Sequence, residues 1–160
     1  MNDVDILKKI EKKVLWLACW MIHNANHIRE NQDGLKVGGH QASSASIVSI
    51  MTALYFSILR PEDRVAVKPH ASPVFHAIQY LSGLQTKEKI ENFRGFGGAQ
   101  SYPSRTKDID DVDISTGSVG LGVAMTSFIS LIQDYIARKK FYKNKPLGRM
   151  IALVGDAELD

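Results

Sequence analysis

Cysteine is almost absent from this sequence, and long apolar runs are missing. The single cysteine is Cys19, which excludes an internal disulfide framework and is typical of a reducing compartment. The longest apolar run, residues 14–22, is shorter than the roughly 20 residues that a membrane-spanning helix needs. The first five residues carry two acidic groups and no basic one, unlike the start of a signal peptide. We therefore expect a cytoplasmic protein with no membrane partner.

A strong charge of one sign is also lacking. The chain has 20 Lys and Arg residues against 17 Asp and Glu residues, a formal net charge of +3. This excess is too small to indicate a nucleic-acid partner. Hydrophobic residues make up 44% of the 160 residues, and a chain of this length buries roughly 70% of its unfolded surface. Global disorder is thus excluded, and the length is that of one ordinary domain without internal repeats.

The apolar residues that are present alternate between helix and strand spacing. Period-3.6 patterns, turns and caps predict helices over 3–29 (ended by a turn at 31–34), 43–59, 72–84, 86–93 and from the glycine run 117–122 to about 140. Serines 43, 44 and 46 are cap candidates for the second of these helices. Short strands are predicted over 64–68, 112–116 and 149–154, and the last has an unbroken apolar run typical of a strand buried on both faces. The pattern predicts an α/β fold, a mostly parallel sheet with helices on both faces, preceded by an N-terminal helix.

The organisation along the chain divides at a turn. Residues 1–33 form an N-terminal helical segment, and residues 34–160 form a partial domain. A strand covered on both faces is expected to lead into a crossover helix, but only six residues follow the apolar run 151–154. We therefore expect this chain to be a truncated fragment of a longer protein.

Polar residues follow the predicted strands at the points where each strand ends. His70 follows the strand 64–68, the glycine run 117–122 follows the strand 112–116, and Asp156 follows the strand 149–154. His40 stands just before a helix N-terminus. Ligands of open α/β sheets bind at the carboxyl ends of the strands. We expect these features to lie at one edge of the sheet.

Each feature also has a structural interpretation. A Gly-Asp pair after an apolar strand is a common turn, although its carboxylate is a hard ligand suited to Mg²⁺. The glycine run does not match G-x-G-x-x-G. It fits close packing of a helix on a sheet and binding of a diphosphate at a helix N-terminus equally well.

Other polar side chains are interpreted as structural. His23 and His27 are four residues apart, a spacing that can bind zinc, but no glutamate stands between them and no third ligand is evident. We expect them to be partly buried on a packing face. Cys19, in an apolar run, is expected to be a buried thiol, and His76 to be packed in a helix or turned to solvent.

Five strings occur in an order that resembles a known family. They are GGHQASS (38–44), HASP (70–73), QSYPS (100–104), GSVGLG (117–122) and GDAELD (155–160). Together they resemble the N-terminal cofactor-binding domain of the transketolase superfamily of thiamine-diphosphate enzymes. Within it, they are most similar to the homodimeric type of pyruvate dehydrogenase E1 component.

The resemblance implies a role for each matching residue. It implies that Asp156 binds the Mg²⁺ ion that bridges the cofactor's diphosphate, and that His40, His70 and Tyr102 are catalytic. The cofactor-binding residues that it implies are Ser43, His70, Gly117, Ser118, Val119, Gly155, Ala157 and Glu158.

The implied activity is thiamine-diphosphate-dependent cleavage of a carbon–carbon bond next to a carbonyl. The favoured form is oxidative decarboxylation of pyruvate or another 2-oxo acid, by a homodimer that transfers the acyl group to a lipoyl-bearing E2 acyltransferase. The alternatives are a transketolase, a non-catalytic binding module of the same fold, and a plain nucleotide-binding α/β domain. The segment around Tyr102 lacks the Gly-His-Pro string of transketolases. This absence favours a 2-oxo acid as the substrate over ketose transfer.

Two departures from the family pattern bear on this reading. Ala157 replaces the second glycine of a Gly-Asp-Gly motif, and a methyl group there could crowd the diphosphate. The second metal-ligand segment and the glutamate that activates the cofactor are absent from the 160 residues, which alone should be inactive.

Overall fold

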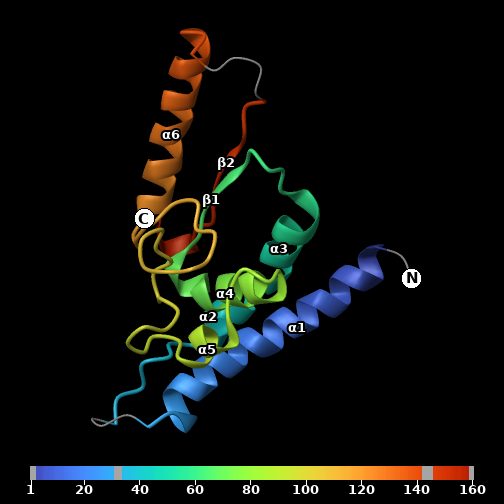
Figure 1. Ribbon diagram of the computed structural model, residues 1–160, viewed down its shortest axis with the longest axis vertical. Coiled ribbons are helices and arrows are strands. Elements are labelled where there is room, and N and C mark those ends of the chain that lie inside the picture. Colours follow the sequence, from blue (N-terminus) through green and yellow to red (C-terminus); the bar gives the residue numbers. More distant parts are fainter. Residues whose placement is uncertain (1–2, 31–33, 142–145, 159–160) are drawn as a thin grey trace.

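The computed structural model describes residues 3–30, 34–141 and 146–158 (Figure 1). The long helix α1 spans Asp3–His23 and continues as the π-helical turn η1 (Asn24–Ile28). Two strands follow further along, β1 (Arg64–Ala66) and β2 (Met150–Ala152). The remaining elements are α2 (Gln41–Ala45), α3 (Val48–Ala53), η2 (Leu54–Ile58), η3 (Pro69–Ala71), α4 (Ser72–Leu81), α5 (Lys87–Glu91), α6 (Leu121–Arg138) and η4 (Asp156–Glu158).

The sheet is parallel, which confirms the predicted α/β class with an N-terminal helix. Strands β1 and β2 pair in the register Arg64↔Met150, Val65↔Ile151 and Ala66↔Ala152. The predicted strand over 112–116 is wrong, since it contributes a single parallel bridge between Ile114 and Ala66. The carboxylate of Asp113 accepts a hydrogen bond from the backbone N–H of Val65 at 2.9 Å, so a side chain takes the place of the ladder carbonyl.

The core lies where α1 and α4 pack together. Helix α4 is buried over eight of its ten residues, and Pro73 stands in its first turn, where a missing N–H costs least. Helix α1 contributes one face to this core, with Val14, Ala18 and Met21 fully buried. The N-terminal helix is therefore part of the same core as α4.

The predicted helix over 43–59 is broken into three pieces. Helix α2 begins at Gln41 after His40, earlier than expected, and no side chain caps it. The expected serine caps are therefore wrong. Ser46 Oγ donates to the carbonyl of Ser43 at 3.2 Å, a local bond that competes with helix propagation between α2 and α3.

The apolar run in β2 is less buried than expected. Its residues are half-buried, because within the described part of the chain β2 pairs with β1 on one side only. Helix α6 runs alongside this sheet, and Figure 1 shows α6 and β2 extending away from the end of the molecule where α1, α2, α4 and α5 gather.

Asp63 fastens the starts of the two strands. Its buried carboxylate accepts hydrogen bonds from Arg149 at the backbone N–H (2.8 Å), Nε (3.0 Å) and Nη2 (2.5 Å). The backbone N–H of Arg60 donates to it as well, at 2.9 Å. The Arg149 guanidinium holds the pKa of the Asp63 carboxyl well below its usual range.

Two expectations fall partly or wholly outside the described residues. The turn at 31–34 is described at Gly34 alone, and the last two residues of the string GDAELD are not described. Among the described residues, no helix combines the length and the apolar character that crossing a membrane requires.

Candidate functional site

Three of the expected features meet at the carboxyl ends of β1 and β2. Strand β1 leads through Lys68 into η3, and β2 leads through Gly155 into η4; the N–H of Leu153 still bonds to the carbonyl of Ala66 at 3.0 Å. The glycine run lies against both. A Cβ on Gly120 would come within 2.8 Å of the Glu158 carbonyl oxygen, and one on Gly122 within 3.4 Å of the Ala66 Cβ. The start of α6 therefore abuts the loop that carries Asp156.

The turn before α6 has an unusual backbone. Val119 and Gly120 both adopt left-handed conformations, with φ of 61° and 75°. This region is strained for a β-branched residue, and such strain is concentrated at functional sites. The Val119 side chain is 85% exposed, so no packing of its own explains the conformation. Gly117 and Ser118 complete this turn. Gly120 occupies the N-cap position of α6, so no side chain caps the start of this helix.

The loop after β2 offers one carboxylate for a metal ion. Asp156 is exposed and makes no ion pair with any described residue. The N–H of Gly155 donates to Glu158 Oε2 at 3.0 Å, while Glu158 Oε1 is buried without a hydrogen-bond partner among the described residues. Ala157, between them, is exposed.

These residues fit a magnesium diphosphate in part. No group of three or more His, Cys, Asp or Glu side chains able to hold a metal occurs among the described residues. Mg²⁺ is commonly bound by one or two carboxylates together with phosphate oxygens and water. Asp156 can supply the protein ligand of such a site, and the glycine turn stands at the N-terminus of α6, where the helix dipole favours phosphate.

A second group of expected residues lines a neighbouring cavity of about 300 Å³. His40, Ser43 and His70 all lie on its wall, together with Gly38, Gly39, Ser44, Pro73, Ile22 and Arg94. Ser44 Oγ donates to the carbonyl of His70 at 3.3 Å and ties α2 to η3. The two histidines, 30 positions apart in sequence, are thus brought to one cavity.

Asn26 holds the glycine pair ahead of His40 in place. Its Oδ1 accepts from the N–H of Gly38 at 2.6 Å, and its Nδ2 donates to the carbonyl of Gly39 at 3.0 Å. A Cβ on Gly38 would meet the carbonyl of Ile22 at 2.5 Å, so glycine is required for this close approach to the end of α1.

Tyr102 lies in a different hollow from the two histidines. It lines a cavity of about 370 Å³ with Ser104, Lys107 and Thr116. Thr116 directly precedes the glycine turn, so this hollow adjoins the start of the turn. The structure therefore does not bring Tyr102 into the cavity that holds His40 and His70.

Two basic residues near the site were not anticipated. Arg94 lines the histidine cavity, donates from Nη1 to the carbonyl of Val37 at 2.6 Å, and stacks on the Phe93 ring at 5.4 Å from its centroid. Burial lowers the pKa of Arg94. Its place in an irregular loop gives no periodic signal. The second residue is Lys68, which lies two residues after the end of β1.

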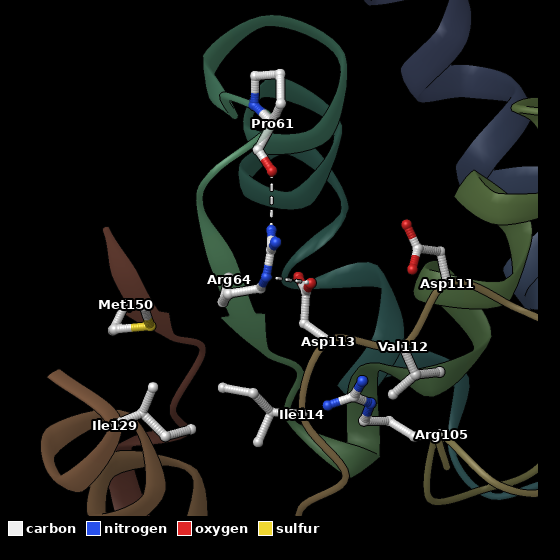
Figure 2. A pocket seen from close by; sticks show the side chains of 9 residues that line it. All are labelled: Pro61, Arg64, Arg105, Asp111, Val112, Asp113, Ile114, Ile129 and Met150. Atoms are coloured by element: carbon white, nitrogen blue, oxygen red, sulfur yellow. Dashed lines mark hydrogen bonds and ion pairs between the residues drawn. The ribbon is translucent and has the colours of Figure 1, made fainter. Parts of the chain in front are cut away.

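A cavity of about 490 Å³ lies at the opposite end of the strands (Figure 2). Figure 2 shows the Arg64 guanidinium between the carbonyl of Pro61, to which it donates at 2.9 Å, and Asp113, at 3.5 Å. Burial raises the pKa of Asp113. Two arginines and two aspartates line this cavity, so it has no clear preference for anions, and no expected site residue lies in it.

Three expectations about structural residues need correction or completion. His23 and His27 are exposed, with ring centroids 5.0 Å apart, because they project from the end of α1 and from η1 beyond the packing face. Cys19 is half-buried rather than buried. His76 is fully buried: its Nε2 donates to the carbonyl of Gln100 at 2.7 Å, and its Nδ1 contacts the Asp110 carboxylate.

The comparisons with known proteins agree with the resemblance at a coarse level. No family model matches the chain. Over 170 residues and 99% of its length, it is 30% identical to the pyruvate dehydrogenase E1 component of Pseudomonas aeruginosa and 27% identical to that of Mycolicibacterium smegmatis. Over 168 residues it is 25% identical to that of Escherichia coli. The chain spans 18% of the length of these relatives. Along its whole length, it is therefore related to one part of pyruvate dehydrogenase E1 components.

Proposed function

We propose that the chain belongs to a thiamine-diphosphate- and Mg²⁺-dependent enzyme of the transketolase superfamily. The reaction is oxidative decarboxylation of pyruvate or another 2-oxo acid, followed by acyl transfer to a lipoyl-bearing partner. The observation that carries the proposal is similarity over 99% of the chain to proteins named pyruvate dehydrogenase E1 component. The meeting of the glycine turn with the Asp156 loop gives independent support.

The diphosphate end of the cofactor belongs at the carboxyl ends of β1 and β2. Asp156 would bind the Mg²⁺ ion there. Backbone groups of the turn Gly117, Ser118 and Val119 would contact the diphosphate, with the positive end of the α6 dipole beside it. Gly155, Ala157 and Glu158 form the adjoining wall.

The reacting end belongs at the histidine cavity. Thiamine diphosphate, when bound, supplies a nucleophilic carbon and accepts electrons while a carbon–carbon bond breaks. His40 and His70 would exchange protons with the reacting atoms, as histidine does readily near neutral pH. Ser43 would bind the cofactor from the same wall. Tyr102 would reach the reaction from its own hollow beside Thr116.

The assembly follows from the same proposal. We assign residues 34–160 to part of a cofactor-binding domain, and residues 1–33 to an N-terminal helical segment whose helix α1 packs on α4. The active form would be a homodimer in the cytoplasm. Its small-molecule substrate would be pyruvate or a related 2-oxo acid.

Calorimetric titration of thiamine diphosphate in the presence of Mg²⁺ tests the proposal. We expect saturable, metal-dependent binding to the full chain and its loss in Asp156→Ala. Asp134→Ala, which removes an exposed carboxylate from α6, is the matched control and should bind normally. A folded protein that binds no thiamine diphosphate would contradict the proposal and favour the non-catalytic module. Binding of ATP or NAD instead would favour the plain nucleotide-binding domain.

The substrate is tested separately on the protein as its own cell makes it. Pyruvate-dependent reduction of an artificial electron acceptor is expected. Consumption of ketose phosphates without pyruvate turnover would identify the transketolase alternative.

A further inference from the structure

Lys68 lies two residues beyond the carboxyl end of β1. Its stem extends across to the loop after β2. A Cβ on Gly155 would meet the Lys68 ammonium and would lie 3.1 Å from its Cε. The ammonium thus fills the space that any side chain at position 155 would need, immediately before Asp156.

This ammonium is unpaired within the part of the chain that the structure describes. Lys68 is half-buried, and no ion pair or hydrogen bond of its side chain occurs among the described residues. The nearest acidic positions along the loop are Asp156, which is exposed, and Glu158, whose Oε2 is held by the Gly155 N–H. A partly desolvated cation without a counter-ion is costly, and an anion bound beside it recovers that cost.

The surroundings select the class of anion. The glycine turn that starts α6 approaches the same loop through Gly120 and Glu158, so a helix N-terminus and a lysine ammonium lie at one edge of the sheet. Lysine binds phosphate as a point charge and needs no bidentate geometry. A carboxylate could also approach, but a phosphate carries more charge and more acceptor oxygens.

We propose that Lys68 binds a phosphate group of a diphosphate ligand at the carboxyl ends of β1 and β2. The Lys68 ammonium neutralises part of the negative charge of the diphosphate, a role that a divalent ion otherwise fills alone. Diphosphate binding at this site therefore persists, weakened, when the metal is removed. This inference rests on the proposed function for the location of the diphosphate but adds a residue and a metal-independent component.

The test is calorimetric titration of inorganic pyrophosphate into the full chain, in excess EDTA and separately with Mg²⁺. The wild type is expected to bind in EDTA. Lys68→Gln should weaken that binding about ten-fold or more, the usual worth of one charge-assisted hydrogen bond. Lys68→Arg, which keeps the charge, should retain most of the affinity, and the loss in Lys68→Gln should be smaller with Mg²⁺.

The matched control is Lys87→Gln, which removes an exposed lysine paired with Glu91 on α5. Far-UV circular dichroism and thermal unfolding report whether each variant is folded. Wild type that binds pyrophosphate only with Mg²⁺, or Lys68→Gln indistinguishable from Lys87→Gln, overturns the inference.

The two proposals fail differently. Metal-dependent binding of thiamine diphosphate that needs Asp156 but not Lys68 leaves the proposed function standing and removes the inference. A folded chain that binds neither pyrophosphate nor thiamine diphosphate, with or without Mg²⁺, removes both.

Discussion

Helices α4 and α6 are both apolar, yet their surroundings differ. Eight of the ten residues of α4 are buried, whereas in α6, described over all 18 residues, Thr126 alone is buried. The exposed apolar side chains of α6 are Leu121, Met125, Phe128, Leu131, Ile132 and Tyr135. Apolar spacing identifies both helices, but it does not say what covers them. Most of the buried core lies in the first half of the chain, whereas the second half carries a large exposed apolar surface beside the candidate site.

The largest expected effect separates the two helices directly. Phe75 in α4 is 1% exposed and Phe128 in α6 is 64% exposed. Phe75→Ala should lower the free energy of unfolding by about 3–5 kcal/mol, because it leaves a cavity in the core. Phe128→Ala should change it by about 0.5 kcal/mol or less. Urea denaturation of both variants measures the difference, and equal losses would contradict the contrast between the helices.

The next effect concerns the junction of the two halves at Asp63. Its pKa is lowered in the folded state, so its stabilising contribution is complete above the ordinary value of 3.8 and is lost as the pH falls below it. Asp63→Asn should lower the melting temperature at pH 7 and flatten its fall between about pH 4 and pH 2. Asp108→Asn is the comparison variant. Asp108 is also a carboxylate bonded to backbone N–H groups, but its partners lie in the same half of the chain. If the melting temperature of Asp63→Asn depended on pH as that of the wild type does, Asp63 would not be the source of this pH-dependent stability.

A smaller effect is expected on association. Exposed apolar patches of this kind promote binding between proteins. The 160-residue chain should self-associate at micromolar concentration, and the double variant Phe128→Lys, Leu131→Lys should reduce this in sedimentation velocity. The double variant Lys8→Glu, Lys9→Glu on α1 is the control for altered charge. A monodisperse, monomeric wild type would show that the exposed apolar surface of α6 does not drive self-association.

The smallest effect is at the turn before α6. Val119→Gly relieves a left-handed conformation and should raise the free energy of unfolding by about 0.5–1 kcal/mol. Val123→Gly, inside α6, should lower it by about 1 kcal/mol. Chemical denaturation distinguishes the two. A destabilising Val119→Gly would mean that the valine side chain, though exposed, contributes to the fold.

Local patterns in the sequence predicted much of the fold. The parallel character of the sheet and the helices α1, α4 and α6 were predicted from the period of the apolar residues and from turns and caps, whereas the pairing of β1 with β2 was not predicted. The strand at 112–116 failed because the Asp113 side chain replaces a ladder carbonyl, a competition that hydropathy does not register. The helix at 43–59 forms with an interruption at residues 46–47, where Ser46 Oγ donates to the backbone carbonyl of Ser43.

Part of the candidate site followed from one rule about strand ends. That rule led to Asp156, the glycine turn and His70. The structure packs the glycine turn against the loop that carries Asp156, through Glu158, and places His70 in one cavity with His40. Tyr102 lies apart because the irregular loop 94–111 has no period from which to place it. Lys68 and Arg94 were missed because their importance lies in which neighbours they lack or touch, and only three-dimensional contacts reveal that.

The most direct test of the account is hydrogen–deuterium exchange of the full chain with and without thiamine diphosphate and Mg²⁺. We expect the ligand to protect three segments together, at residues 66–70, 117–122 and 153–158, and to protect residues 38–44 to a lesser degree. The cavity of Figure 2, at residues 61–64 and 111–113, should be unaffected. Protection at that cavity, with none at the carboxyl ends of β1 and β2, would contradict the account.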